Sequence, residues 1–279
     1  MTTAVVTIAH GRHQHLTAQR RSLDAGTQRP DHYVVVAMDD EWIADWAPGR
    51  DLVPYVVEVP MDPRGLPLAA ARNAGVRAAV ALGADVVIGL DVDCLVAADL
   101  VAGYETAVLE EPGTLWSGPV TYLAPPAGGG YDLARLEEED SPHPARPAPA
   151  RGMHVGGGHP DLFWSLSYAL HRDAWLRIGG FDEEYVGYGA EDTDFGHRAA
   201  AVGIELSWTG SARAYHQYHG TESPPVHHLD DILRNGEIFH GRWGRWPMTG
   251  WLESFEELGL VTRTGTGWSA VRAGPVRGS

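Results

Sequence analysis

The stretch Val86-Val87-Ile88-Gly89-Leu90-Asp91-Val92-Asp93 decides the fold of this chain. Its first five residues are apolar on both faces, and three of them are β-branched, which is typical of a strand buried in a parallel sheet. Two carboxylates follow at once, where that strand ends. Open α/β sheets bind ligands beyond the carboxyl ends of their strands, so this stretch predicts both a sheet and a site.

The residues before this stretch repeat the same kind of pattern. Apolar β-branched runs occur at Val5–Ala9, Tyr33–Ala37 and Tyr55–Val59, and helical patterns alternate with them at 15–25, 68–82 and 97–110. Such alternation predicts the α/β class, with a Rossmann-like, doubly wound mixed sheet whose strands are buried on both faces.

The length of 279 residues and the 44% hydrophobic content suit one large domain with a small appendage. We expect that domain at 1–225, a helical C-terminal extension at 226–262 and a flexible tail at 263–279. Within the domain, residues 123–151 are rich in Pro, Gly and acidic side chains, and they cannot build a core of their own. They predict a mobile loop.

The charge balance excludes several classes of function. The chain has 37 acidic and 21 basic residues, a net charge of −16, and every basic residue is arginine. Without lysine there is no P-loop and no Schiff-base chemistry, and an acidic surface argues against nucleic-acid partners. The single cysteine, Cys94, allows neither an internal disulfide nor a cysteine-based zinc site. No apolar stretch is long enough for a membrane span or signal peptide, so we expect a cytoplasmic protein.

Two acidic motifs carry the chemistry. Asp91 and Asp93 can converge on a divalent cation, for which hard oxygen ligands favour Mg²⁺ or Mn²⁺; the alternative is that they cap the following helix. Glu191 and Asp192 follow a glycine-rich run, Gly187-Tyr188-Gly189-Ala190, at the start of a predicted helix. Helix capping explains acidic residues there, but it does not explain the glycines before them.

Taken together and in this order, four motifs resemble glycosyltransferase family 2 and related GT-A enzymes. They are Ala71-Arg72-Asn73-Ala74-Gly75, Asp91-Val92-Asp93, Gly179-Gly180-Phe181-Asp182-Glu183 and Gly187-Tyr188-Gly189-Ala190-Glu191-Asp192. The last two are similar to the galactosyltransferase-type pattern G-G-F-D-E … G-W-G-G-E-D, with Tyr188 in place of tryptophan and Ala190 in place of the second glycine. The resemblance spans residues 4–220 and implies a GT-A fold.

The resemblance also implies roles for individual residues. The metal and the donor diphosphate would be held by Asp93 and Asp91; the nucleotide would be contacted by His10, Asp39 or Asp40, Arg72 and Asn73; the acceptor would be engaged by Glu191 and by Asp192 as general base; and the sugar would meet Tyr188 and Gly189. Independently of the resemblance, the aromatic face of Trp164 suits the apolar face of a sugar ring; core packing is the alternative. Galactosyltransferase-like enzymes complete their metal site after a late strand. Here that position holds His216 and His219, of which we favour His219; a surface role is the alternative.

These features predict a metal-dependent glycosyltransferase that uses Mn²⁺ or Mg²⁺ and moves a sugar from a nucleotide-sugar donor to an acceptor hydroxyl. We expect a UDP-sugar as donor, a small molecule or glycan as acceptor, and inversion at the anomeric carbon. A sugar-phosphate nucleotidyltransferase and an inactive nucleotide-sugar-binding module are the alternatives. The sequence leaves the oligomeric state open.

Overall fold

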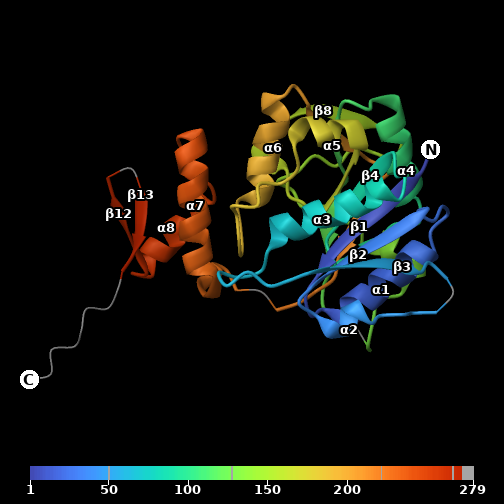
Figure 1. Ribbon diagram of the computed structural model, residues 1–279, viewed down its shortest axis with the longest axis horizontal. Helices are drawn as coiled ribbons and strands as arrows, with labels where there is room; N and C mark the ends of the chain where they lie inside the picture. The colour runs from blue at the N-terminus through green and yellow to red at the C-terminus, as the bar shows by residue number, and fades with distance from the viewer. Residues whose placement is uncertain (50, 127, 221, 266, 272–279) are drawn as a thin grey trace, which may run out of the picture.

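The structure, a computed structural model, describes residues 1–49, 51–126, 128–220, 222–265 and 267–271. A mixed sheet with the strand order β3-β2-β1-β4-β9-β6-β10-β8 forms its centre (Figure 1). The strands are β1 (Thr3–Ala9), β2 (His32–Met38), β3 (Pro54–Val59), β4 (Val86–Leu90), β6 (Leu115–Ser117), β8 (His154–Gly158), β9 (Ser167–His171) and β10 (Leu206–Thr209). The α/β class and the doubly wound mixed sheet are confirmed.

The predicted parallel strands are the first four, β1 to β4, and they pair in parallel. Alternate side chains of β1 enter different cores, because successive residues of a strand point to opposite faces: Val5 lies in one core and Val6 in the other. The expectation that all four strands are buried is wrong for β3. It is the edge of the sheet, and Tyr55 is exposed.

Helices cover both faces of the sheet. The core that contains Val5 includes side chains from α1 (His13–Asp24), α2 (Glu41–Ala44) and α4 (Leu100–Glu110). The core that contains Val6 includes side chains from α3 (Leu68–Ala81), α5 (Arg172–Ile178) and α6 (Glu191–Ala201). This double cover fixes the sheet and leaves the carboxyl ends of its parallel strands available for a site.

A second, smaller sheet lies next to the end of β4. Its order is β5-β11-β7, with β5 (Cys94–Val96), β7 (Val120–Tyr122) and β11 (Ala214–His216). The antiparallel register sets His216 opposite Cys94. A residue late in the chain is therefore held beside the Asp91-Val92-Asp93 segment.

The Pro- and Gly-rich segment 123–151 contains a 3-10 helix, η1 (Leu133–Glu139). Leu136 of this helix is buried against Leu95 and Tyr215 of the small sheet. Part of the segment therefore packs on the domain. Its mobility stays a prediction.

The C-terminal extension contains η3 (Val226–His228), α7 (Leu229–Trp243) and α8 (Thr249–Glu257), to one side of the main body (Figure 1). The expected flexible tail is wrong for the described residues from 263 to 271. There β12 (Val261–Thr264) and β13 (Gly267–Ala270) form a hairpin, and Trp268 packs with the helices. Residues 266 and 272–279 lie outside the described part. None of the described helices is both long and apolar enough to cross a membrane.

Candidate active site

Arg72 of α3 joins the two acidic motifs. Its guanidinium donates to Asp91 Oδ1 at 3.2 Å and to Glu191 Oε1 at 3.0 Å, and the arginine is buried. Burial alone would lower the pKa of Arg72, but the charges of the two carboxylates outweigh it and raise the pKa. A buried charge needs such partners, and here one cation holds residues from β4 and α6 in one cluster.

The Asn73 side chain lies beside this cluster, and both of its polar atoms form hydrogen bonds within the protein. Its Nδ2 donates to the Phe181 carbonyl and to Glu183, both at 2.8 Å, and its Oδ1 accepts from the Phe181 N–H at 2.8 Å. The amide therefore has no donor left for the expected nucleotide contact. It holds the Gly180-Phe181 turn in place.

Glu191 and Asp192 are the first two residues of α6. The glycine-rich run directly before them contains Gly187 and Gly189, both of which have positive φ. Burial raises the pKa of both carboxyls, and Asp192 raises that of Glu191 further by repulsion. Glu191 Oε2 is buried without a hydrogen-bond partner among the described residues. Asp192 is only half-buried, and its Oδ1 accepts from the Thr193 N–H at 2.6 Å.

Three of the four predicted metal ligands come together. One ligand atom from each of Asp93, His216 and His219 lies within 4.8 Å of the others. His216 Nε2 is 3.5 Å and His219 Nε2 is 3.3 Å from an Asp93 oxygen. Burial favours protonation of Asp93, but the hydrogen bond from His219 and the nearby charges outweigh it and lower its pKa. Burial also lowers the pKa of His216, which leaves a neutral imidazole.

Carboxylate and neutral imidazole are a donor set that suits Mn²⁺. Asp93 Oδ1 is buried and has no hydrogen-bond partner among the described residues, as expected of an atom reserved for an ion. Asp91 stands apart from this triad, because Arg72 binds it and burial raises its pKa to about 6. The residues therefore fit a cation at Asp93, His216 and His219.

The expected nucleotide contacts lie at the end of β2. Asp40 caps α2 and accepts from the Gly11 N–H at 2.7 Å and from His13 Nε2 at 2.9 Å. His10 is exposed, and its Nδ1 lies 2.7 Å from the Met38 carbonyl. Asp39 is exposed, and no hydrogen bond joins its carboxylate to any described residue. Of the two aspartates, Asp39 is the one left to meet a ligand.

The expected sugar-binding residues occupy two places. Trp164 is half-buried and donates its Nε1–H to the Asp161 carbonyl at 3.2 Å. The Tyr188 ring stacks on His228 with centroids 4.4 Å apart, and the charges of Asp192 and Glu191 act on its hydroxyl. Tyr188 therefore lies beside the acidic pair and Trp164 lies under the 123–151 segment.

The first turns of α7 hold the glycine-rich run, a role that the sequence did not reveal. Asp231 Oδ2 accepts from the Tyr188 N–H at 3.1 Å, and Asn235 Nδ2 donates to the Gly189 carbonyl at 2.9 Å. A side chain at Gly187 would come within 2.3 Å of the Asp231 carboxylate. Only glycine allows this close approach, and its φ of 76° also favours glycine.

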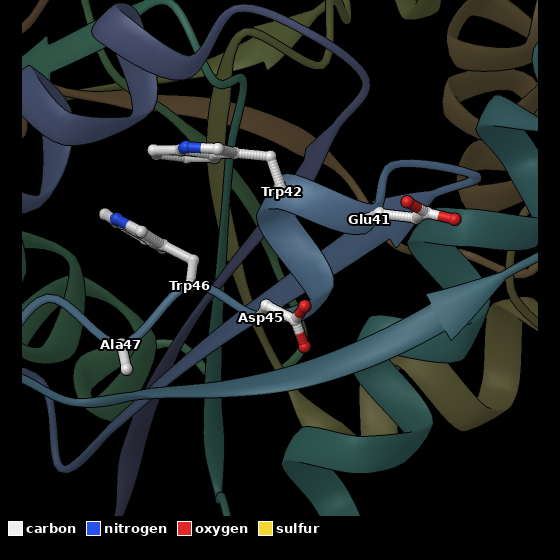
Figure 2. A pocket seen from close by; sticks show the side chains of 5 residues that line it. All are labelled: Glu41, Trp42, Asp45, Trp46 and Ala47. Carbon is white, nitrogen blue, oxygen red and sulfur yellow. The ribbon is translucent and has the colours of Figure 1, made fainter.

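Two hollows differ in their relation to this site. The larger, about 410 Å³, lies on the surface beside α2, and Figure 2 shows the indoles of Trp42 and Trp46 facing it with Glu41 and Asp45 nearby. None of the acidic pair or the triad lines it. The smaller, about 10 Å³, is lined by Arg72 and Asp91 among others and has room for about one water.

Residues 160–220 match the family model described as the N-terminal domain of galactosyltransferase. This segment runs through α6 and β11 and contains the acidic pair and both histidines of the triad. The match therefore covers the acidic pair and two of the three triad residues, although it is a minor part of the chain.

Curated relatives match short stretches. Validoxylamine A glucosyltransferase of Streptomyces hygroscopicus subsp. jinggangensis is 42% identical over 45 residues, which cover 16% of this chain and 11% of that protein. N-acetylglucosaminyl-diphospho-decaprenol L-rhamnosyltransferase of Mycobacterium tuberculosis is 34% identical over 84 residues, which cover 28% of this chain and 27% of that protein. The chain thus matches only about a quarter or less of the length of these relatives.

Solved structures share the architecture over most of the chain. GalNAc-T7, crystallised with UDP, GalNAc and Mn²⁺, has a TM-score of 0.53 at 18% identity and covers 78% of this chain and 44% of its own. The mannosyltransferase PcManGT of Pyrobaculum calidifontis, in complex with GDP-Man and Mn²⁺, has a TM-score of 0.54 at 18% identity and covers 88% and 65%. This chain is a GT-A-fold protein with glycosyltransferase relatives.

Proposed function

We propose that this chain transfers a sugar from a nucleotide-sugar donor, with UDP-sugars as the expected donors, to a hydroxyl of a small-molecule or glycan acceptor. One observation carries the proposal: Arg72 ties Asp91 to Glu191 beside the Asp93-His216-His219 triad, at the carboxyl ends of the parallel strands. The resemblance and the glycosyltransferase relatives support the same reaction class.

Asp93, His216 and His219 would hold the cation, Mn²⁺ or Mg²⁺. When bound, such an ion offsets the negative charge of the departing diphosphate. Asp91 would lie next to this cation, held by its ion pair with Arg72. Asp39, at the end of β2, is the expected contact to the base or ribose.

Asp192 is the proposed general base. Glu191 is buried and its Oε1 accepts from Arg72, whereas Asp192 is half-buried and adjoins Tyr188. The acceptor oxygen attacks the anomeric carbon, its proton passes to Asp192, and the bond to the diphosphate oxygen breaks. Attack from the face opposite the leaving group inverts the anomeric centre. A raised pKa makes Asp192 a better proton acceptor near neutral pH.

A donor screen tests the proposal. The protein is incubated with UDP- and GDP-sugars, Mn²⁺ or Mg²⁺ and a panel of acceptors, and release of nucleoside diphosphate is measured. We expect turnover that is lost in Asp192→Asn and in Asp93→Asn and kept in Asp230→Asn, which changes an exposed carboxylate. Wild-type rates in both site variants would overturn the assigned roles. Pyrophosphate release from a nucleoside triphosphate and a sugar phosphate would instead identify a nucleotidyltransferase.

A further inference from the structure

Arg146, in the Pro-rich segment 123–151, is a buried cation without a counter-ion. The residue is 6% exposed, and its Nε, Nη1 and Nη2 atoms have no hydrogen-bond partner among the described residues. No ion pair joins it to a described carboxylate either. Arginine does not lose its proton in proteins, so this positive charge stays in a poorly solvated place.

The surroundings of Arg146 connect it to the reaction centre. Its guanidinium lies over the Trp164 ring, 5.3 Å from the centroid. Ring contacts then lead from Trp164 to His143 at 5.2 Å, from His143 to Tyr122 at 5.7 Å and from Tyr122 to His216 at 4.7 Å. The row of aromatic rings ends at the proposed cation site.

The charged groups that act on Arg146 include the candidate site residue Asp192. Burial lowers the pKa of Arg146, and the charge of Asp192 is near enough to oppose that effect. Asp192 nevertheless makes no ion pair with it, and Thr193 is the residue that donates to its carboxylate. The guanidinium is therefore close enough to feel the charge of Asp192, and its donors are unused.

A buried charge without a partner is costly, because the protein does not replace the solvation that the charge loses. Arg72 cannot serve a ligand in the same way, because its guanidinium already binds Asp91 and Glu191. Arg146 is a guanidinium with all three nitrogens unpaired, and this geometry suits the paired oxygens of a phosphate.

We propose that Arg146 binds the diphosphate of the nucleotide-sugar donor and stays with it as the leaving group departs. This inference rests on the proposed function and adds a cation from segment 123–151 to the donor site. The guanidinium nitrogens are closed off from solvent, and the cavity at Arg72 and Asp91 holds about 10 Å³. The diphosphate therefore reaches Arg146 only after the part of the chain around Arg146 shifts.

Calorimetry in the presence of EDTA tests the charge directly, with UDP, inorganic pyrophosphate and uridine as probes. Arg146→Met removes the charge and keeps an apolar stem, and Arg146→Lys keeps a charge. The matched control is Arg135→Met, in the same segment, which changes an exposed arginine paired with Glu138. We expect Arg146→Met to weaken the binding of UDP and of pyrophosphate at least tenfold and to leave the binding of uridine unchanged. The affinities of Arg146→Lys should be intermediate, and those of Arg135→Met should equal the wild-type values.

Thermal unfolding separates this role from a structural one. Removing an uncompensated buried charge should leave the melting temperature of the ligand-free protein equal or higher, whereas a structural arginine would lower it on replacement. Unchanged UDP affinity in a folded Arg146→Met variant overturns the inference and leaves the glycosyltransferase proposal standing. Absence of UDP and pyrophosphate binding in the wild type, both in EDTA and in a repeat titration with Mn²⁺, overturns both.

Hydrogen exchange on the wild-type protein provides a second test that does not depend on how a variant folds. UDP should change the exchange of peptides within 142–151, relative to uridine at equal saturation. UDP binding without any change in those peptides overturns the inference.

Discussion

Asp231 of α7 accepts a hydrogen bond from the backbone N–H of Tyr188 at 3.1 Å. The other oxygen of the same carboxylate accepts from Arg234 at 2.7 Å. A residue of the C-terminal extension thus fixes the backbone of the glycine-rich run, and it does so next to the acidic pair. The extension therefore contacts the candidate site directly.

Replacing Asp231 should therefore impair the acceptor step. Asp231→Ala leaves the Tyr188 N–H without its partner, which costs about 1–2 kcal/mol and corresponds to a loss of roughly tenfold in kcat/KM for the acceptor. Donor hydrolysis without acceptor should change less. Steady-state kinetics with Asp230→Ala as the control, one position away and exposed, separates this effect from a general change of charge. Equal losses in the two variants would rule out the specific contact.

Ala190 occupies a position that glycine would fill with less strain. Its φ is 73°, in the left-handed region, where a Cβ costs about 1 kcal/mol. Ala190→Gly should therefore raise the free energy of unfolding, or leave it unchanged once the larger entropy of the unfolded glycine chain is included. The control is Ala200→Gly, at an exposed position within the same helix, which should destabilise by about 1 kcal/mol. Urea titration of both variants shows whether the two signs differ.

Loss of Arg72 should destabilise the protein in a pH-dependent way. Arg72→Met leaves Asp91 and Glu191 buried without their cation, at a cost of about 3–5 kcal/mol when both are ionised. Carboxyl groups whose pKa is raised by folding bind protons more tightly in the native state, so their contribution to stability falls as pH rises. The deficit should be largest near pH 8 and should shrink as pH falls toward 5.

The control for Arg72→Met is Arg77→Met, in the same helix, where an exposed arginine meets Glu183 at 3.5 Å. Such surface pairs contribute little, and we expect a change within about 0.5 kcal/mol that does not vary over this pH range. Urea titrations at pH 5.5 and pH 8 provide the measurement. A deficit of Arg72→Met that is constant with pH would contradict the charge cluster.

The turnover number kcat should fall as the solution is acidified, and this fall should begin at a pH above the ordinary pKa of an aspartate. Burial raises the pKa of Asp192, and the general base works only when it is ionised. The profile of kcat against pH should rise with unit slope and then level off near neutral pH. Asp192→Asn should remove this limb and lower kcat by roughly 10²–10⁴. A limb that persists at the same pH in Asp192→Asn would assign it to another group.

Mn²⁺ binding should depend on the triad. Calorimetry should show at least a hundredfold weaker binding in Asp93→Asn and a clear loss in His216→Ala and His219→Ala, since each removes one ligand. His227→Ala is the matched control, because His227 is exposed and pairs with Glu222. EDTA should abolish turnover and an excess of Mn²⁺ should restore it. Wild-type affinity in Asp93→Asn would move the cation elsewhere.

The parts of the fold with local signals could be predicted from the sequence. β4 has the predicted bounds, and α3 starts where predicted, because their patterns are regular over a full strand and several helical turns. The three-residue strands β5, β7 and β11 carry no readable pattern, although β5 and β11 are what bring His216 beside Asp93. His216 and Asp93 come together only because strands from distant parts of the chain pair, and local sequence patterns do not predict such pairing.

The same holds for the candidate site, where local motifs could be read from the sequence and contacts between distant residues could not. The motifs singled out Asp93, His216, His219, Glu191 and Asp192 as candidates, since each belongs to a recognisable cluster of residue types. The sequence could not show that Arg72 is shared between two carboxylates, or that Asn73 is saturated by its own loop. The composition around Arg146 predicted a mobile loop, and only the packing on Trp164 revealed that this residue is buried.

The triad joins residues that are about 120 positions apart in the chain, since Asp93 follows β4 and the histidines belong to and follow β11. An unfolded chain cannot present these three groups together, so a cation would bind the native state almost exclusively. At a concentration 100 times its dissociation constant, such an ion adds about 2.7 kcal/mol to the free energy of unfolding. The supply of divalent cations in the cell would then govern how long the enzyme survives as well as how fast it works.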